Sequence, residues 1–265
     1  MTVARPIDDY WAEADTYNPL GMNRPEHIAV LFKIFMESYP ESINHRENLN
    51  KYFLKSHGQV YQDLVAQMYL GWKSNGYFVE FGATDGYDIS NTYLLEKEFG
   101  WTGILAEPAK YWHDKLPTHR SCNIDFNCVW PRSNEKVLFN EGMIRPDAST
   151  TEIYMDYTTD IEKFRGGTKA IYEVDSISLL DLLKKYNAPK DIDFMSLDTE
   201  GSEFEILSNF NFDEYKVKFF AIEHNEKEAN RQKIYELMTS KGYDRVLVNI
   251  SNWDDFYVLP EYNNI

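Results

Sequence analysis

The chain has 265 residues, of which 43% are hydrophobic and 15% aromatic, enough apolar material to build a folded core. Its 43 acidic residues outnumber the 27 basic ones and give a formal net charge of −16. A surface this acidic repels phosphate backbones and anionic lipid headgroups, so neither nucleic acid nor a membrane is an expected partner. No apolar run reaches the roughly 18 residues of a membrane helix, and the N-terminus lacks a basic, then apolar leader, which favours a cytoplasmic protein.

The first part of the chain, residues 1–72, has a helical and irregular pattern. Apolar residues recur with helical spacing over 27–39 and 61–72, and no stretch alternates as a strand does. From residue 73 onward, short apolar segments alternate with helical ones, which is typical of βαβ units around a parallel sheet. We therefore expect a helical extension at 1–72 and one α/β domain at 73–265.

The α/β domain contains seven expected strands. They are residues 77–82, 104–107, 123–129, 193–198, 219–224, 245–250 and 255–259, and helices are expected at 91–99, 178–186, 203–207 and 226–241. Only residues 251–254 join the last two strands, which is too short for a parallel crossover and predicts an antiparallel hairpin. The predicted fold is a doubly wound, seven-stranded, mostly parallel sheet with an antiparallel edge hairpin and an N-terminal helical extension.

Residues 139–172 fit no βαβ unit. The segment is rich in Thr, Asp and Gly and contains the pair Gly166 and Gly167. Long loops inside compact domains often carry function, so we interpret the segment either as an insertion near a substrate or as a disordered stretch.

The two cysteines, Cys122 and Cys128, are expected to be free thiols. If both lie on one strand, they are about 20 Å apart, far beyond the reach of a disulfide. Free thiols agree with a reducing compartment. The histidines are scattered and no Cys or His spacing suits zinc.

The strongest motif follows the first expected strand. This strand ends near Glu80 and leads into a turn with Gly82 and Gly86, where missing Cβ atoms permit a tight turn and close approach of a ligand. The second expected strand ends at Glu107, near the spacing of about 20 residues at which a carboxylate receives ribose hydroxyls in nucleotide-binding βαβ units. The combination indicates a nucleoside pocket, whereas the glycines alone would indicate only a strand-to-helix turn.

The acids of this turn indicate the charge of the ligand. A dinucleotide site has the spacing Gly-x-Gly-x-x-Gly, whereas Gly82 and Gly86 have the spacing Gly-x-x-x-Gly. The carboxylates of Glu80 and Asp85 would repel a diphosphate. They suit S-adenosylmethionine, which carries a positive sulfonium and an ammonium group.

A second group of polar residues follows two later strands. Asp198 and Glu200 come at the end of the fourth expected strand, and Glu223, His224 and Asn225 come at the end of the fifth. Ligands of open α/β sheets bind at the carboxyl ends of the strands, so these side chains should converge. We expect His224 to accept a proton from the substrate, and Asp198 to orient the substrate hydroxyl or the imidazole.

The same residues have alternative uses. Asp198, Glu200, Glu223 and Asn225 could hold Mg²⁺ through oxygen atoms, since hard cations take such ligands. This use is not favoured, because no dense ligand motif is visible, and no metal ligand is assigned. Asp198 could also be a buried structural acid, and a lone His is more often structural than catalytic.

Several motifs occur together in a fixed order. They are EFGATDG at 80–86, SNT at 90–92, GWTGILAEP at 100–108 and DFMSLDTEGSE at 193–203. Over roughly residues 62–225 the chain resembles the FkbM family of methyltransferases. The resemblance implies a class I methyltransferase fold, S-adenosylmethionine as donor, and O-methylation, frequently of sugars in glycans or natural products. The extension and residues 139–172 lie outside the motifs and are where substrate identity would be encoded.

These observations define the expected site. The expected cofactor-binding residues are Glu80, Gly82, Ala83, Thr84, Asp85, Gly86, Asn91, Glu107, Pro108, Asn127, Cys128 and Asp198. Glu200, Glu223 and Asn225 are expected to bind the substrate, and His224 and Asp198 to be catalytic. The predicted function is O-methylation of a hydroxyl on a small molecule, a sugar or a glycan precursor. The alternative is a cofactor-binding scaffold or sensor of the same fold that is catalytically silent.

Overall fold

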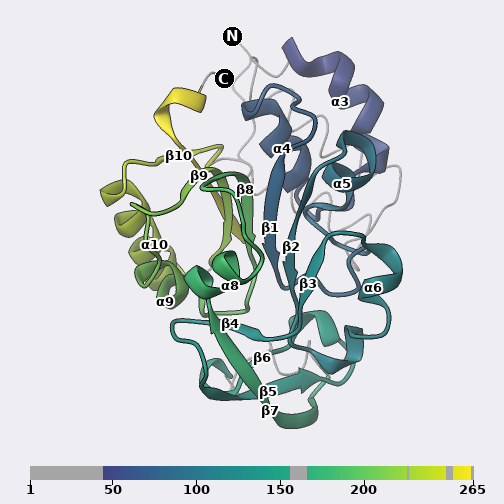
Figure 1. The fold of residues 1–265 in the computed structure, drawn as a ribbon, viewed down its shortest axis with the longest axis vertical. Coiled ribbons are helices and arrows are strands. Elements are labelled where there is room, and N and C mark those ends of the chain that lie inside the picture. Colours follow the sequence, from purple (N-terminus) through teal and green to yellow (C-terminus); the bar gives the residue numbers. More distant parts are fainter. Residues whose placement is uncertain (1–43, 156–165, 226, 249–252, 264–265) are drawn as a thin grey trace.

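A computed structural model describes residues 44–155, 166–225, 227–248 and 253–263 of the chain (Figure 1). The helix predicted at 27–39 and the end of the sixth predicted strand, residues 249–250, lie outside the described residues. None of the described helices is long and apolar enough to cross a membrane.

A seven-stranded sheet forms the centre of the molecule, in the order β10-β11-β9-β8-β1-β2-β3. Its strands are β1 (Tyr77–Phe81), β2 (Thr102–Ala106), β3 (Asn123–Asp125), β8 (Asp191–Leu197), β9 (Lys216–Glu223), β10 (Asp244–Val246) and β11 (Asp254–Val258). Strand β11 pairs antiparallel with both β9 and β10, and the other pairs are parallel. The predicted mostly parallel sheet with its antiparallel hairpin is confirmed. The chain order reverses between β1 and β8, and open α/β sheets bind ligands at such a switch point.

Helices cover both faces of this sheet. Those on one face are α4 (Gln62–Tyr69) and α5 (Tyr93–Phe99), and those on the other are α8 (Leu179–Lys185), α9 (Glu203–Ser208) and α10 (Glu228–Ser240). Side chains alternate between the two cores, so that Phe78 packs on the α4 side and Val79 on the α8 side. Strands buried on both faces have continuous apolar sequences, which is why most of them could be predicted.

The end of the N-terminal extension packs into the same core. Helix α3 (Arg46–Tyr52) and a 3-10 turn, η2 (Phe53–Lys55), precede α4. Helix α4 corresponds to the helix predicted at 61–72, and all its residues are buried. The ring of Tyr69 in α4 lies 5.2 Å from that of Phe219 in β9, measured between centroids. The remaining short elements are η3 (Lys110–Trp112), α6 (Leu116–His119) and η6 (Pro260–Tyr262).

The prediction of one strand at 123–129 was wrong, because two strands in different sheets occupy this stretch. Strand β3 ends at Asp125, and β4 (Cys128–Trp130) pairs in a second sheet. Between them, the Asp125 Oδ1 accepts a hydrogen bond from the backbone N–H of Asn127 at 2.9 Å. Such a turn redirects the chain. The two cysteines therefore do not share a strand, and both are free, as predicted.

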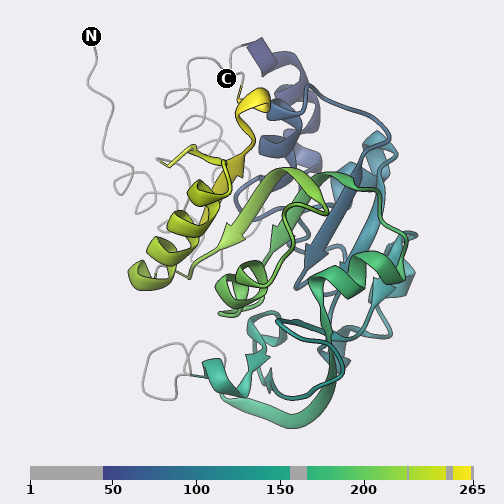
Figure 2. The ribbon, with the colours of Figure 1, turned by 60° about the vertical axis from the view of Figure 1, so that its left-hand side comes forward.

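The second sheet has the order β4-β7-β5-β6 and lies beyond one end of the main sheet (Figures 1 and 2). It comprises β4 together with β5 (Lys136–Gly142), β6 (Thr150–Thr151) and β7 (Thr168–Ser178), with the 3-10 turns η4 (Pro146–Ala148) and η5 (Glu152–Tyr154). The segment 139–172 thus contains the end of β5, all of β6 and the start of β7, and residues 156–165 lie outside the described residues. The interpretation as an insertion holds for the described part, and disorder does not.

Candidate active site

A pocket lies at the carboxyl ends of the central strands, between the main sheet and the second sheet. Gly82 after β1, Glu107 after β2 and Asp198 after β8 line it. Three further predicted site residues also line it: Pro108, Cys128 and Glu200. The two halves of the sequence motif therefore meet in one place, at the switch point of the sheet.

Gly82 is required by the close approach of two strand ends. Its φ is +70°, and a Cβ there would lie 2.0 Å from the backbone oxygen of Asp198. Any side chain would therefore push β1 and β8 apart, in addition to the cost of the left-handed backbone. The glycine thereby places Asp198 beside the turn that follows β1.

Glu107 is 4% exposed and is fixed by backbone donors. Its Oε2 accepts from the N–H of Thr84 and its Oε1 from that of Ala109, both at 2.8 Å. Burial raises the pKa of Glu107 to about 8, against the effect of these two bonds. A carboxyl group has about four hydrogen-bonding positions, so two are left for ribose hydroxyls. The free positions of Glu107 therefore fit the nucleoside part of S-adenosylmethionine.

The rest of the glycine turn is held by Asp85. Its Oδ1 accepts from the N–H groups of Tyr87 and Asp88, each at 2.9 Å. In the described part of the chain, neither Asp85 nor its neighbours Ala83, Thr84 and Gly86 are among the residues that line the pocket. The structure shows Asp85 shaping the turn, and direct contacts of these residues with a cofactor stay a prediction.

Glu80 binds the segment that leads into α5. Its Oε1 accepts from the N–H of Asn91 at 2.7 Å, and its Oε2 accepts from the hydroxyls of Ser90 and Thr92. The fully buried guanidinium of Arg120 lies 3.6 Å from Oε2 and also binds Ser90 and Thr92. No motif in the sequence signalled Arg120. Glu80 and Arg120 together order this segment, and contact of Glu80 with a cofactor stays a prediction.

Two predicted asparagines lie apart from the lined pocket. The side chain of Asn91 donates to the Ser196 hydroxyl at 2.9 Å, which ties the start of α5 to β8. Asn127 lines a neighbouring depression with Asp181 and Lys185. Its neighbour Cys128 does line the main pocket. Of the predicted cofactor-binding pair Asn127 and Cys128, only Cys128 therefore lies at the pocket.

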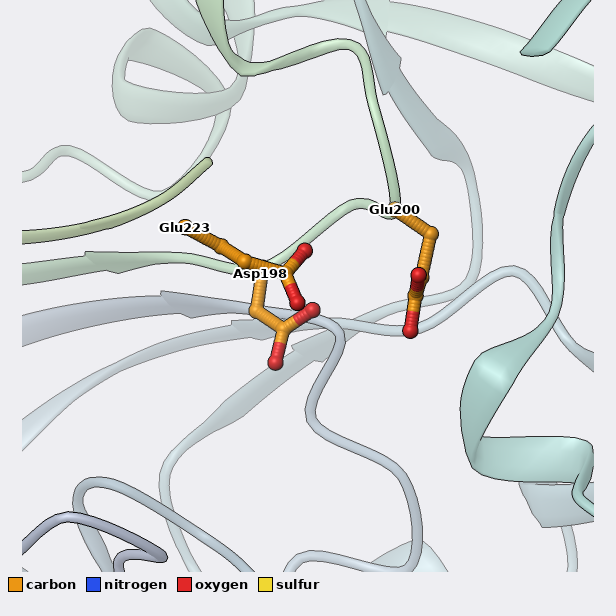
Figure 3. A group of neighbouring side chains, drawn as sticks. All are labelled: Asp198, Glu200 and Glu223. Carbon is orange, nitrogen blue, oxygen red and sulfur yellow. The ribbon is translucent and has the colours of Figure 1, made fainter. Parts of the chain in front are cut away.

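Three carboxylates converge beside the pocket, as predicted (Figure 3). Asp198, Glu200 and Glu223 each offer an oxygen, and these oxygens lie within 4.8 Å of one another. The amide of Asn225 donates to Glu223 at 3.0 Å and to Glu200 at 3.2 Å. Burial raises the pKa of both Asp198 and Glu223, and the neighbouring negative charges raise it further. The group is therefore built to hold a proton or a cation.

Glu203 supports the loop that carries Glu200. Its Oε1 accepts from the N–H of Thr199 at 2.8 Å and from that of Gly201 at 3.1 Å. These two residues flank Glu200, so the carboxylate of Glu203 fixes the backbone there. An acid at the start of this helix thus serves the backbone N–H groups of the preceding loop.

His224 lies beside a different acid. It is 2% exposed, and its Nε2 is 3.9 Å from Oδ1 of Asp255 in β11. Asp255 in turn binds Arg231 at 2.7 Å. Burial lowers the pKa of His224. Within the described residues, His224 belongs neither to the lined pocket nor to the group of three carboxylates, and its catalytic role stays a prediction.

The second sheet contributes pocket residues that were not individually predicted. Asp147, Ser149 and Thr151 line the pocket, together with Thr199 and Ser202 from the loop before α9. The only signal in the sequence was the position of the segment 139–172 outside the methyltransferase motifs. Residues of that segment line the pocket, and their proximity to a substrate stays a prediction.

A family model described as "Methyltransferase FkbM domain" matches residues 80–245. The chain belongs to the FkbM methyltransferase family. The resemblance seen in the motifs is therefore confirmed, and the family implies S-adenosylmethionine as the methyl donor.

Two solved methyltransferase structures are similar to this FkbM methyltransferase at low identity. Precorrin-6y C5,15-methyltransferase from Geobacter metallireducens GS-15 shares 9% identity, with a TM-score of 0.40 over 74% of this chain and 85% of that chain. A methyltransferase from Pyrococcus furiosus shares 10% identity, with a TM-score of 0.35 over 74% of this chain and 82% of that chain. No curated protein matches the chain. The family assignment rests on the family match and the fold on the strand order.

Proposed function

We propose that this FkbM methyltransferase transfers the methyl group of S-adenosylmethionine to a hydroxyl of a sugar or glycan precursor. The observation that carries the proposal is the convergence of Asp198, Glu200 and Glu223 beside the pocket that Gly82 and Glu107 line. A nucleoside subsite and a proton-binding acid group at one switch point are what methyl transfer to a hydroxyl requires.

The residues of the pocket would bind the cofactor and align the acceptor. Glu107 would receive the ribose hydroxyls, and the turn after β1 would lie against the methionine part. When bound, the cofactor supplies an electrophilic methyl group. Holding two reactants in register is worth up to about 7–11 kcal/mol of the barrier.

Asp198 is the proposed proton acceptor that the structure favours, because it lines the pocket. A hydroxyl is a poor nucleophile at neutral pH, and a group that takes its proton contributes about 10²–10⁴-fold in rate. The raised pKa of Asp198 makes its carboxylate a better proton acceptor than an exposed one. Asp198 would take the hydroxyl proton while the hydroxyl oxygen bonds to the methyl carbon. The carbon–sulfur bond of the donor would break at the same time, and S-adenosylhomocysteine would leave.

His224 is the other proposed acceptor, with Asp198 orienting the hydroxyl or the imidazole. The contact of His224 with Asp255 favours a positioning role instead. Asp198→Asn and His224→Ala separate the two assignments. Substitution of the true acceptor should cost most of kcat, by about 10²-fold or more. Asp213→Asn, at an exposed position, is the matched control and should leave kcat unchanged.

The decisive experiment combines calorimetry with a turnover assay. We expect S-adenosylhomocysteine to bind and small glycans or activated sugars to gain one methyl group by mass. Binding without methylation of any offered acceptor would favour the catalytically silent scaffold or sensor. Full activity in both the Asp198 and His224 variants would leave alignment alone as the mechanism.

A second role for the three carboxylates is to hold Mg²⁺, which their mutual distances within 4.8 Å support. Hard cations bind carboxylate and amide oxygens, and a bound cation would orient neighbouring hydroxyls of a sugar. Asn225 would then have to turn its amide oxygen toward the group. Loss of wild-type activity on chelation, with recovery on adding Mg²⁺, is the expected result for this role. Activity that is indifferent to the chelator would leave Asp198 acting without a metal.

A further inference from the structure

One side of the pocket is built by the second sheet, and its residues have no role in the chemistry described above. Thr151 in β6 lines this side, together with Asp147 and Ser149 from the segment that precedes it. On the main sheet, Asp198 and Glu200 line the same pocket. The acid group and the second sheet therefore face a common space.

Thr151 carries a buried hydroxyl for which the described part of the chain provides no hydrogen-bond partner. The residue is 3% exposed, and its Oγ1 has no hydrogen-bond partner among the described residues. Buried polar side-chain atoms in folded proteins nearly always have a partner, and an exception calls for a specific explanation. Because Thr151 lines the pocket, its hydroxyl is a candidate to bind a ligand there.

The position of Thr151 is fixed by its neighbours. It is paired with Phe139 across the β5–β6 ladder. The adjacent hydroxyl, on Thr150, donates to the backbone oxygen of Glu200 at 3.0 Å. Strand β6 is therefore tied both to the second sheet and to the loop that carries Glu200, so the hydroxyl of Thr151 is preorganised for a ligand.

The charges around this part of the pocket are mostly negative. The guanidinium of Arg145 supplies a positive charge here, and its Nε lies 3.0 Å from the Asp147 carboxylate. Asp147 and, to a smaller extent, Glu200 raise the pKa of Arg145, so both acids act on this cation. Asp198 and Glu223 lie next to Glu200, and although burial raises the pKa of both, any charge that they carry is negative. An anionic ligand would therefore be repelled, and juxtaposed like charges are a strong means of rejecting a wrong partner.

We propose that Thr151 determines specificity in an acceptor subsite between β6 and the loop before α9, which accepts uncharged or cationic hydroxyl compounds and rejects anionic ones. Resting on the proposed methyl transfer, this proposal names the class of acceptor and the residue on the second sheet that binds it.

Three sugars of equal size test the charge selectivity. They are the methyl glycosides of glucose, glucosamine and glucuronic acid, which differ by a neutral, a cationic and an anionic group. Their binding is measured by calorimetry to the full-length protein saturated with S-adenosylhomocysteine. We expect the glucoside and the glucosaminide to bind, and the glucuronide to bind at least about tenfold more weakly.

Thr151→Val tests the hydroxyl, because valine keeps the branched shape and strand preference of threonine. We expect the affinity for the methyl glucoside to fall about five- to tenfold with unchanged affinity for S-adenosylhomocysteine, which also shows that the variant is folded. Thr168→Val, at the start of β7 in the same sheet, is the matched control and should bind like the wild type.

Each outcome separates this proposal from the proposed function. The subsite is overturned if none of the three sugars binds, if the glucuronide binds as well as the glucoside, or if Thr151→Val binds the glucoside like the wild type. Should Thr151→Val fail to fold, the binding of the three methyl glycosides to the wild type still tests the charge selectivity of the subsite. Selective binding without methyl transfer to any acceptor would support the subsite and overturn the proposed function. Methyl transfer to the glucoside at equal efficiency in the wild type and in Thr151→Val would support the proposed function and overturn the subsite.

Discussion

Replacing Asp63 with asparagine should change the pH dependence of folding. Asp63 lies in α4 and is fully buried, with Oδ1 accepting from the Ser56 hydroxyl at 2.5 Å and from the Leu64 N–H at 2.7 Å. Burial raises the pKa of Asp63 from 3.8 to about 7, against the effect of these bonds. The Asp63→Asn side chain would keep an acceptor oxygen in this place and would carry no titrating group.

The sign and size of the effect follow from the raised pKa. In the folded protein Asp63 stays protonated up to about pH 7, whereas in the unfolded chain it ionises near its ordinary pKa of 3.8. Its stabilising contribution is therefore fully present below about pH 4 and is lost as the pH rises through 7. Between about pH 5 and 7 the wild type should lose about 1.4 kcal/mol of unfolding free energy per pH unit through this group.

Urea unfolding of the wild type and Asp63→Asn, followed by tryptophan fluorescence, measures this contribution. The other buried acids titrate in both proteins, so their contributions cancel when the unfolding free energy of the wild type is subtracted from that of the variant. The unfolding free energy of the variant relative to the wild type should rise by about 3 kcal/mol between about pH 5 and 8 and then level off. Asp213→Asn removes an acid from the surface as the control. A difference that does not change with pH would refute the argument that burial keeps Asp63 protonated.

Three further predictions concern the site and its surroundings. Glu107→Ala should weaken S-adenosylhomocysteine binding by about 1–3 kcal/mol in calorimetry, and unchanged affinity would remove Glu107 from the cofactor site. Gly82→Ala should lower the unfolding free energy by about 3 kcal/mol or more, because its Cβ would lie 2.0 Å from the Asp198 oxygen; a stable, active variant would contradict the described contact. Burial raises the pKa of Cys122 and Cys128 to about 12, so a thiol reagent should react slowly with the native protein and find two groups after denaturation. A finding of no free groups would contradict the structure.

The main sheet could be predicted because its strands are buried on both faces and therefore have apolar sequences of strand length. The convergence of Asp198, Glu200, Glu223 and Asn225 also followed from the sequence, since the ends of neighbouring parallel strands meet at one edge. Neither inference needs any knowledge of distant contacts.

Other features depend on contacts between residues far apart in the chain. The turn at Asp125 divides a stretch whose composition suits one strand, and the pairing of β5 with β7 joins segments about 30 residues apart with no local signal. Arg120 and Asp255 explain the placement of Glu80 and His224, and each is contributed by another element. The position at a strand end predicts where the backbone of a residue lies. The direction and contacts of its side chain depend on a partner residue elsewhere in the chain.

The two sides of the pocket come from separate segments of the chain, which has an evolutionary consequence. The turn after β1 and Glu107, where we expect the cofactor, lie between residues 80 and 107, whereas the second sheet begins at β4 and ends at Ser178, which caps α8. On the proposed function, substitutions in β5, β6 and the residues between them can reshape the acceptor side without altering the strands that lead to Glu107 and Asp198. A lineage of such enzymes could then diversify its choice of acceptor while retaining its methyl donor, and exchanging this segment between relatives should transfer acceptor preference as a unit.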